Sequence, residues 1–192
     1  MSSTVRTFVA LPVPPAAGRA LAGLQERLRS GLAGRGEIRW VRPDQFHLTL
    51  LFIGERPRAE LPSMAERLRE AVAGFSAFSL ALEGVGAFPG PSRPRVVWVG
   101  VSAGAASLVR LAAAVASALE PFAPAEAERD FHPHVTLGRV KWLAPGFSFA
   151  AWVDGCLPTP IGPQRLERVV LYASRLTPAG AQYAELAHVD LA

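Results

Sequence analysis

The spacing between hydrophobic residues changes several times along the chain, and each spacing predicts a helix or a strand. Residues 5–12 contain a short apolar run that is stopped by prolines, which predicts a strand. After two further prolines, Leu21, Leu24 and Leu28 recur at the spacing of a helix. We therefore expect a strand followed by a helix that ends before the glycine-rich residues 31–36.

The same changes of period continue along the rest of the chain. They predict strands over residues 38–41, 46–53, 78–85, 96–101, 131–140, 168–174 and 183–189, and helices over residues 60–73, 105–119 and 147–154. Strands and helices follow in roughly the same order in the two halves, which predicts an α+β protein with two similar lobes and a cleft between them. Because no stretch is long and polar enough to be a linker, we expect residues 1–192 to form one bilobal domain without independent subdomains.

Composition narrows the class of protein further. Half of the 192 residues are hydrophobic, so the chain can bury a sizeable core. The single cysteine, Cys156, cannot form an internal disulfide, which fits a reducing compartment. The first ten residues do not resemble a signal peptide, and no run of about 18 apolar residues predicts a membrane span. We expect a cytoplasmic protein without membrane association.

The net charge of +4 is modest, and arginine supplies nearly all of the positive charge, since Lys141 is the only lysine. Together with the many alanines and prolines, this is more typical of a biased genome composition than of selection for polyanion binding. Several arginines nevertheless lie near the two motifs described next, where they would attract a phosphate-bearing ligand. They are Arg39, Arg42, Arg56, Arg58, Arg93, Arg95, Arg129 and Arg139.

One short motif occurs twice, as His47-Leu48-Thr49-Leu50 and as His134-Val135-Thr136-Leu137. Each copy falls in a predicted strand, where side chains two residues apart point to the same face. The histidine and the threonine of each copy therefore share a face. If the two strands face each other, two imidazoles and two hydroxyls converge on one small volume.

Such a group of side chains suits acid–base chemistry on a phosphate. Histidine gives or takes a proton near neutral pH, and cleavage of a phosphodiester needs one proton removed from water and one donated to the leaving oxygen. Threonine hydroxyls can bond the non-bridging oxygens, where charge develops in the transition state. A single His-x-Thr in a strand is usually structural, whereas two copies in matching context favour a catalytic pair, His47 and His134.

The sequence resembles the two-histidine phosphoesterase superfamily and, within it, the RNA 2′,3′-cyclic phosphodiesterases, also called 2′-5′ RNA ligases. The paired motifs carry this resemblance, together with residues 6–12, 39–54, 84–89, 95–101, 131–139 and 169–175. The resemblance implies a bilobal α+β fold in which two antiparallel sheets, each with flanking helices, line an active-site cleft. It also implies hydrolysis of RNA 2′,3′-cyclic phosphate ends to 2′-phosphomonoesters without a metal or cofactor, and reverse 2′-5′ ligation.

The resemblance also implies roles for individual residues. His47 would protonate the departing 3′ oxygen, and His134 would activate water. Thr49 and Thr136 would bind the phosphate, and the family pattern places an arginine near the phosphate where Arg139 stands. Strict strand alternation puts Arg139 on the face opposite His134, although a bulge at the preceding glycine could turn it back.

Other interpretations remain open at this point. The substrate could be a small cyclic nucleotide, and the chain could be a non-catalytic RNA-binding module or a metal-dependent hydrolase. The proline in His132-Pro133-His134, and the lack of a third Cys or His nearby, argue against a metal site. We expect a monomer whose partners are RNA ends or small cyclic nucleotides. Four aromatic residues could stack on a base or belong to the core: Trp40, Phe46, Trp98 and Phe131.

Overall fold

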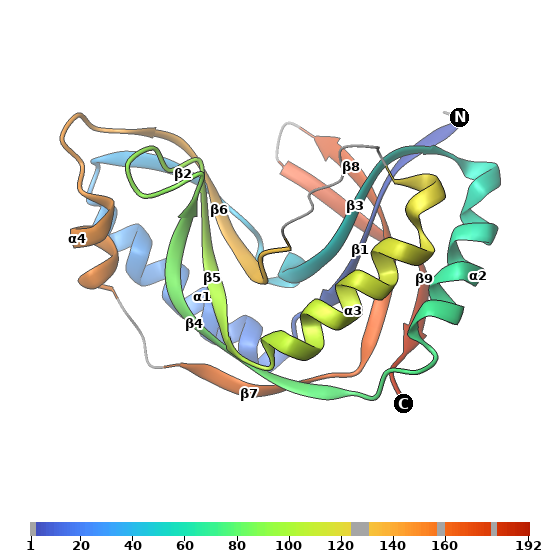
Figure 1. Ribbon diagram of the computed structural model, residues 1–192. Coiled ribbons are helices and arrows are strands. Elements are labelled where there is room, and N and C mark those ends of the chain that lie inside the picture. The colour runs from blue at the N-terminus through green and yellow to red at the C-terminus, as the bar shows by residue number, and fades with distance from the viewer. Residues whose placement is uncertain (1–2, 124–130, 157–159, 178–179) are drawn as a thin grey trace.

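The computed structural model describes residues 3–123, 131–156, 160–177 and 180–192 (Figure 1). Within these residues the chain forms nine strands and four α-helices. The strands are β1 (Thr4–Pro12), β2 (Gly36–Trp40), β3 (His47–Pro57), β4 (Phe78–Phe88), β5 (Val96–Ala103), β6 (His134–Leu143), β7 (Ile161–Leu166), β8 (Arg168–Thr177) and β9 (Gly180–Asp190). The helices are α1 (Pro15–Leu32), α2 (Leu61–Val72), α3 (Ala105–Ala118) and α4 (Phe149–Asp154), and the short 3₁₀ turn η1 (Pro43–Gln45) precedes β3.

All strand pairs are antiparallel, in the order β7-β4-β5-β6-β3-β1-β8-β9, with β2 also paired to β6. The central pair, β3 with β6, is joined through Leu48 and Val135 alone. At this junction the sheet divides into two, and Figure 1 shows the two parts diverging upwards from it. The predicted α+β fold with two antiparallel sheets is confirmed.

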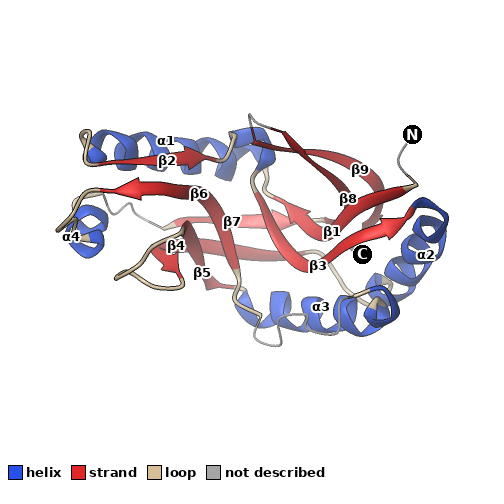
Figure 2. Ribbon diagram, turned by 90° about the horizontal axis from the view of Figure 1, so that it is seen from above, coloured by secondary structure: helices blue, strands red, loops and turns tan. Residues whose placement is uncertain are grey.

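The two lobes are not the two halves of the sequence. The first lobe contains β2, β4, β5, β6 and β7 with helices α1 and α4, and the second contains β1, β3, β8 and β9 with helices α2 and α3 (Figures 1 and 2). The second sheet therefore joins strands from both ends of the chain, because β1 pairs with β3 on one side and with β8 on the other.

Most of the predicted strands differ from the observed ones in where they begin or end, and one observed strand was not predicted. The predicted strand 131–140 begins only at His134, and residues 131–133 precede it without regular structure. The sequence pattern did not predict β7, because Gly162 and Pro163 interrupt its apolar positions. A proline has no amide hydrogen to donate to a neighbouring strand. Strand β7 tolerates Pro163 because it lies at the edge of the sheet and has a strand on one side only.

The helices bury their apolar stripes on the sheets. Leu21, Leu24 and Leu28 of α1 are fully buried, as the helical spacing predicted. Helices α2 and α3 bury a similar stripe against the second lobe. Leu48 and Val135, at the junction, point into this core, so their strand neighbours point to the opposite face. No helix of the described residues is long and apolar enough to cross a membrane.

Candidate active site

His47 and His134 each stand at the first position of a strand, next to the junction of the two sheets. His47 precedes Leu48 in β3, and His134 precedes Val135 in β6. Because Leu48 and Val135 are paired and point into the core, both histidines lie on the other face, together with Thr49 and Thr136. The structure thus places the four side chains of the two motifs on one face, from two strands that are far apart in the sequence.

The two imidazoles are held in the same way. Nδ1 of His47 lies 2.7 Å from the carbonyl oxygen of Gln45, and Nδ1 of His134 lies 2.6 Å from that of His132. A carbonyl oxygen can only accept, so Nδ1 donates in both cases and the neutral ring carries its lone pair on Nε2. Each histidine is therefore fixed in orientation and tautomer by the backbone two residues before it.

His47 packs among aromatic rings of the second lobe. Its ring centroid lies 5.1 Å from that of Phe8 and 5.2 Å from that of Tyr183, which meets it edge-on. Burial lowers the pKa of His47 below its ordinary value, and the charge of His134 lowers it further, whereas the bond to Gln45 opposes this shift. In the ligand-free protein the neutral ring of His47 is thus favoured.

His134 has a corresponding aromatic wall in the first lobe. Phe88 meets it edge-on at 5.0 Å between ring centroids, and Trp98 lies at 6.1 Å. The indole of Trp98 in turn lies directly over Gly86, where an added Cβ would stand 2.2 Å from the ring. A glycine at this position of β4 leaves the space that the indole occupies beside His134.

Arg139 lies on the same face as His134, contrary to strict alternation. On β5, Val96, Trp98 and Gly100 alternate without interruption and pair with Arg139, Thr136 and His134 respectively. The register shifts between Val97 and Trp98, so β6 holds one extra residue there, at Leu137 and Gly138. This bulge turns Arg139 back to the face of the histidine.

The bulge needs a glycine and is tied to a helix. A Cβ on Gly138 would stand 2.6 Å from the Ile38 side chain and 3.1 Å from the Arg39 carbonyl oxygen. Nε2 of Gln25, a buried residue of α1, donates to the carbonyl oxygens of Leu137 and Val41, at 2.8 Å each. The sequence analysis did not identify Gln25, because one polar residue in an apolar helix gives no local signal of what it binds.

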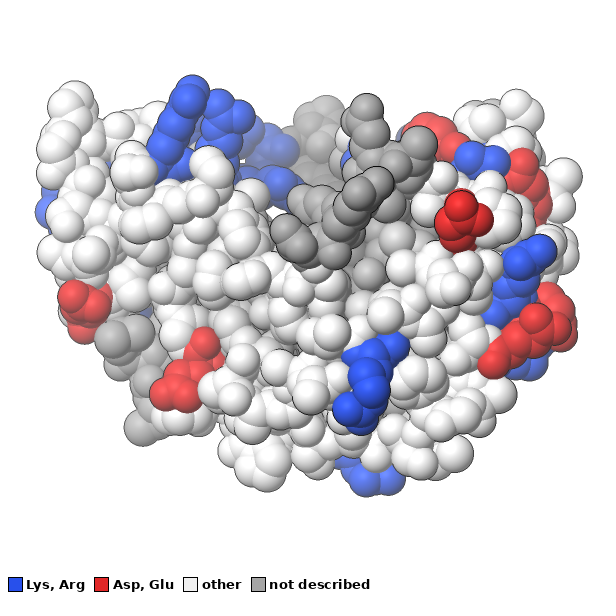
Figure 3. Space-filling view, viewed as in Figure 1, with Lys and Arg blue, Asp and Glu red and all other residues white. Residues whose placement is uncertain are grey.

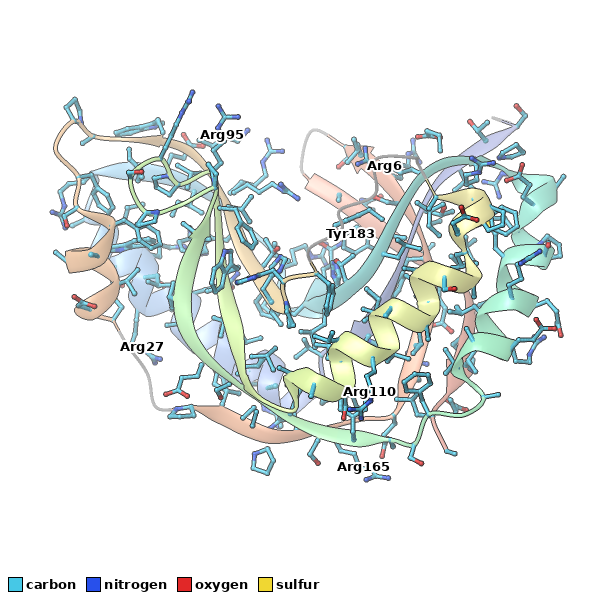
Figure 4. The ribbon with its side chains drawn as sticks, viewed as in Figure 1. Arg6, Arg27, Arg95, Arg110, Arg165 and Tyr183 are labelled. Atoms are coloured by element: carbon cyan, nitrogen blue, oxygen red, sulfur yellow. The ribbon has the colours of Figure 1, made fainter. Side chains whose placement is uncertain are left out.

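Two further residues that the sequence analysis did not select border the space between the lobes. Figure 4 shows Arg6 and Tyr183 on the inner side of the second lobe. Burial raises the pKa of the Tyr183 phenol, while the charges of Arg139 and Arg6 oppose that shift. Arg139 belongs to the first lobe and Arg6 to the second, so the Tyr183 phenol lies within the electrostatic influence of cationic groups from both lobes.

A cavity of about 540 Å³ adjoins His47. It lies between the start of α1, the turn η1 and strands β8 and β9, and Arg19, Gln45, Tyr172 and Tyr183 are among its lining residues. Its size is in the usual range for a site that binds a small organic molecule.

The remaining candidates have different surroundings. Phe46 is buried in the core, and Phe131 packs partly buried against it. Trp40 lies under the guanidinium of Arg29, 5.7 Å from the ring centroid. Arg129 lies outside the described residues. Within the described ranges, no group of three or more His, Cys, Asp or Glu side chains is placed to hold a metal ion.

Comparisons with known proteins agree with this architecture. Residues 11–98 match the model of the LigT-like phosphoesterase family. An RNA 2′,3′-cyclic phosphodiesterase of Archaeoglobus fulgidus is 36% identical over 182 residues, which cover 95% of this chain and 98% of the relative. One of Aeropyrum pernix is 36% identical over 173 residues, covering 90% and 97%. The crystal structure of TT0787 of Thermus thermophilus has a TM-score of 0.78 and 31% identity, covering 97% of each chain.

The fold and the site define a bilobal α+β protein with paired histidines at the junction of two antiparallel sheets. The chain belongs to the LigT-like phosphoesterase family, and the resemblance seen in its sequence is confirmed.

Proposed function

We propose that this protein hydrolyses the 2′,3′-cyclic phosphate ends of RNA to 2′-phosphomonoesters, without a metal, through acid–base catalysis by His47 and His134. The observation that carries the proposal is the matched pair of imidazoles, each held at Nδ1 by a backbone carbonyl. Relatives at 36% identity that carry the name RNA 2′,3′-cyclic phosphodiesterase support it.

In the proposed reaction, Nε2 of His134 takes a proton from water as the water oxygen attacks phosphorus. The bond from phosphorus to the 3′ oxygen breaks, and His47 donates a proton to that oxygen, which leaves the phosphate on the 2′ oxygen. Proton exchange with solvent then restores both rings. Thr49, Thr136 and Arg139 stabilise the non-bridging oxygens as their charge increases.

The lowered pKa of His47 has a consequence for this cycle. The acid must be protonated, whereas burial and His134 favour the neutral ring in the ligand-free protein. A bound phosphate anion favours the charged imidazolium. His47 is therefore proposed to gain its proton as the cyclic phosphate binds, because substrate shifts the ring towards its charged, acidic form.

Two finer possibilities belong to the same site. With a 5′ hydroxyl in place of water, His134 would take the proton of that hydroxyl and His47 would protonate the departing 3′ oxygen, which would give 2′-5′ ligation. In the reverse reaction, cleavage of the 2′-5′ linkage, the histidines would exchange these roles. A small cyclic nucleotide is an alternative substrate, favoured by the cavity beside His47, whose volume lies in the range of small-molecule sites.

The test is to incubate the protein in excess EDTA with an RNA oligonucleotide that ends in a 2′,3′-cyclic phosphate. We expect conversion to a 2′-phosphate, and a loss of at least about a hundredfold in kcat/KM for His47→Ala and for His134→Ala, each with an unchanged circular dichroism spectrum. Turnover that requires an added divalent metal would contradict the metal-free mechanism. Full activity of either variant would exclude that histidine from the reaction.

A further inference from the structure

Arg39 of β2 stands directly opposite Arg139 of β6, and both side chains are exposed. Like charges at opposed positions of an antiparallel pair repel each other and destabilise it. Neither guanidinium forms a hydrogen bond or an ion pair with another described residue, so no ion pair within the described ranges offsets the repulsion. An anion between the two side chains would turn this unfavourable pair into a favourable one.

An exposed indole lies on the same face. Trp142 of β6 pairs with Glu37 of β2, two residues from Arg39, so the three side chains share one side of the sheet. Trp142 is 51% exposed, which is unusual for a side chain of this size. Cationic side chains beside an exposed aromatic ring form the combination that binds single-stranded nucleic acid, because a base can stack on the ring while its phosphate is held.

This pair of strands leads away from the candidate active site. At its start β6 is joined to β3 at Val135, and from Gly138 to Leu143 it pairs with β2 instead. Arg139 stands five residues beyond His134, at most about 16 Å along the strand. Arg39 is one strand further out, on β2, which pairs with β6 and lies beside α1 in the first lobe (Figure 2).

The charge on this side of the molecule is positive. Figure 3 shows Lys and Arg side chains gathered along the left border of the hollow at the top. Arg95, labelled in Figure 4 at the upper edge of the first lobe, accepts a backbone hydrogen bond from Val140 at 2.9 Å, so it adjoins the same part of β6. Lys141 is also exposed there. Glu37 is the acidic residue of β2, and the positively charged side chains on this surface outnumber it.

We propose that Arg39 and Trp142 bind the RNA chain that precedes the terminal nucleotide. Arg39 binds a phosphodiester, and Trp142 stacks on a base. This inference rests on the proposed function and assigns the preference for RNA over a cyclic mononucleotide to β2 and the end of β6. A cyclic mononucleotide held at the two histidines occupies only the inner end of this surface.

The experiment compares two substrates, a ten-nucleotide RNA that ends in a 2′,3′-cyclic phosphate and a 2′,3′-cyclic mononucleotide. Arg39→Gln and Trp142→Ala should each raise KM for the RNA by about five- to tenfold and leave kcat unchanged. For the mononucleotide, kcat/KM should stay within about twofold of the original protein. Arg39→Gln should also reduce the slope of log KM against log salt for the RNA by about 0.7, the contribution of one phosphate contact.

Two variants serve as controls. Arg27→Gln removes an exposed arginine on the far side of the first lobe, at the lower left of Figure 4. This variant should change neither KM nor kcat for either substrate. Arg39→Lys keeps the charge and should preserve the salt slope. Equal reductions in kcat/KM for RNA and for the mononucleotide would overturn the proposal, because Arg39 would then belong to the binding site of the terminal nucleotide. An unchanged kcat/KM for RNA would overturn it as well.

A binding measurement keeps this test separate from the proposed function. Fluorescence anisotropy with a labelled RNA that ends in a 2′-phosphate needs no turnover. If neither cyclic substrate is hydrolysed, the proposed reaction fails, whereas a five- to tenfold weaker affinity of Arg39→Gln for this RNA would still support the RNA-binding surface. Equal affinities of the original protein and Arg39→Gln would overturn it.

Discussion

Nε2 of Gln25 lies 2.8 Å from the carbonyl oxygen of Leu137, a residue 112 positions further along the chain. The same nitrogen donates to the Val41 carbonyl oxygen, and the Val41 amide donates to Leu137. One buried amide on α1 thus ties together the loop after β2 and the bulge of β6. That bulge is what places Arg139 on the face of His134.

Replacing Gln25 by methionine, which has a similar volume, should therefore loosen the bulge. We expect a loss of about 1–3 kcal/mol in the free energy of unfolding, because two buried hydrogen bonds disappear. We also expect kcat/KM for a cyclic phosphate to fall, because Arg139 would be displaced from the non-bridging oxygens. Urea denaturation and steady-state kinetics measure the two effects.

A double-mutant cycle separates positioning from simple destabilisation. If Gln25 acts through Arg139, then Gln25→Met should lower kcat/KM no further once Arg139 is alanine. An equal fall in kcat/KM in both backgrounds would show that Gln25 does not act through Arg139.

The ionisation of His47 should depend on the ligand. In the free protein its pKa lies below the ordinary histidine value because of burial and the charge of His134. A 2′-phosphomonoester bound at the site should raise that pKa. NMR titration of the His47 ring, with and without 2′-AMP, measures both values, and a His134→Gln variant should raise the value in the free protein. An unchanged pKa on binding would argue against proton uptake by His47.

The same lowered pKa makes folding stability depend on pH. Since the folded pKa lies below the unfolded one, the unfolded chain binds a proton more readily, and stability falls as pH decreases through about 6.5 towards the folded value. Above about 6.5 the contribution of neutral His47 is fully present. Urea unfolding measures the loss in the free energy of unfolding between pH 8 and pH 5. This loss should be smaller for His47→Gln than for the original protein, and identical losses would contradict this account.

The two lobes should unfold together. Because β1 and β3 form one sheet with β8 and β9, neither lobe is a continuous segment of the chain. We therefore propose that residues 1–192 form one cooperative unit, as expected from the absence of a linker. Thermal unfolding followed by near-ultraviolet and far-ultraviolet circular dichroism should give coincident transitions. Two separated transitions would show that the lobes are independent.

Several properties stay predictions after the structure. The cytoplasmic location and the monomeric state are predictions from the sequence. The same holds for the roles of the two histidines, for which the assays above are designed.

The sequence alone determined most of the helices and strands and the two motifs. Hydrophobic period is a local property, so the leucine stripe of α1 and the histidine–threonine alternation can be read within a few residues. Edge strand β7 was missed because Gly162 and Pro163 break that local pattern.

Only the tertiary structure decided how these parts meet. Leu48 pairs with Val135, Arg39 stands opposite Arg139, and Gln25 reaches Leu137, and each of these contacts joins segments far apart in the sequence. Strand pairing and bulges depend on which strands become neighbours, and local periodicity does not contain that information. The motif thus predicted the candidate reacting groups, while long-range pairing decided which faces and charges surround them.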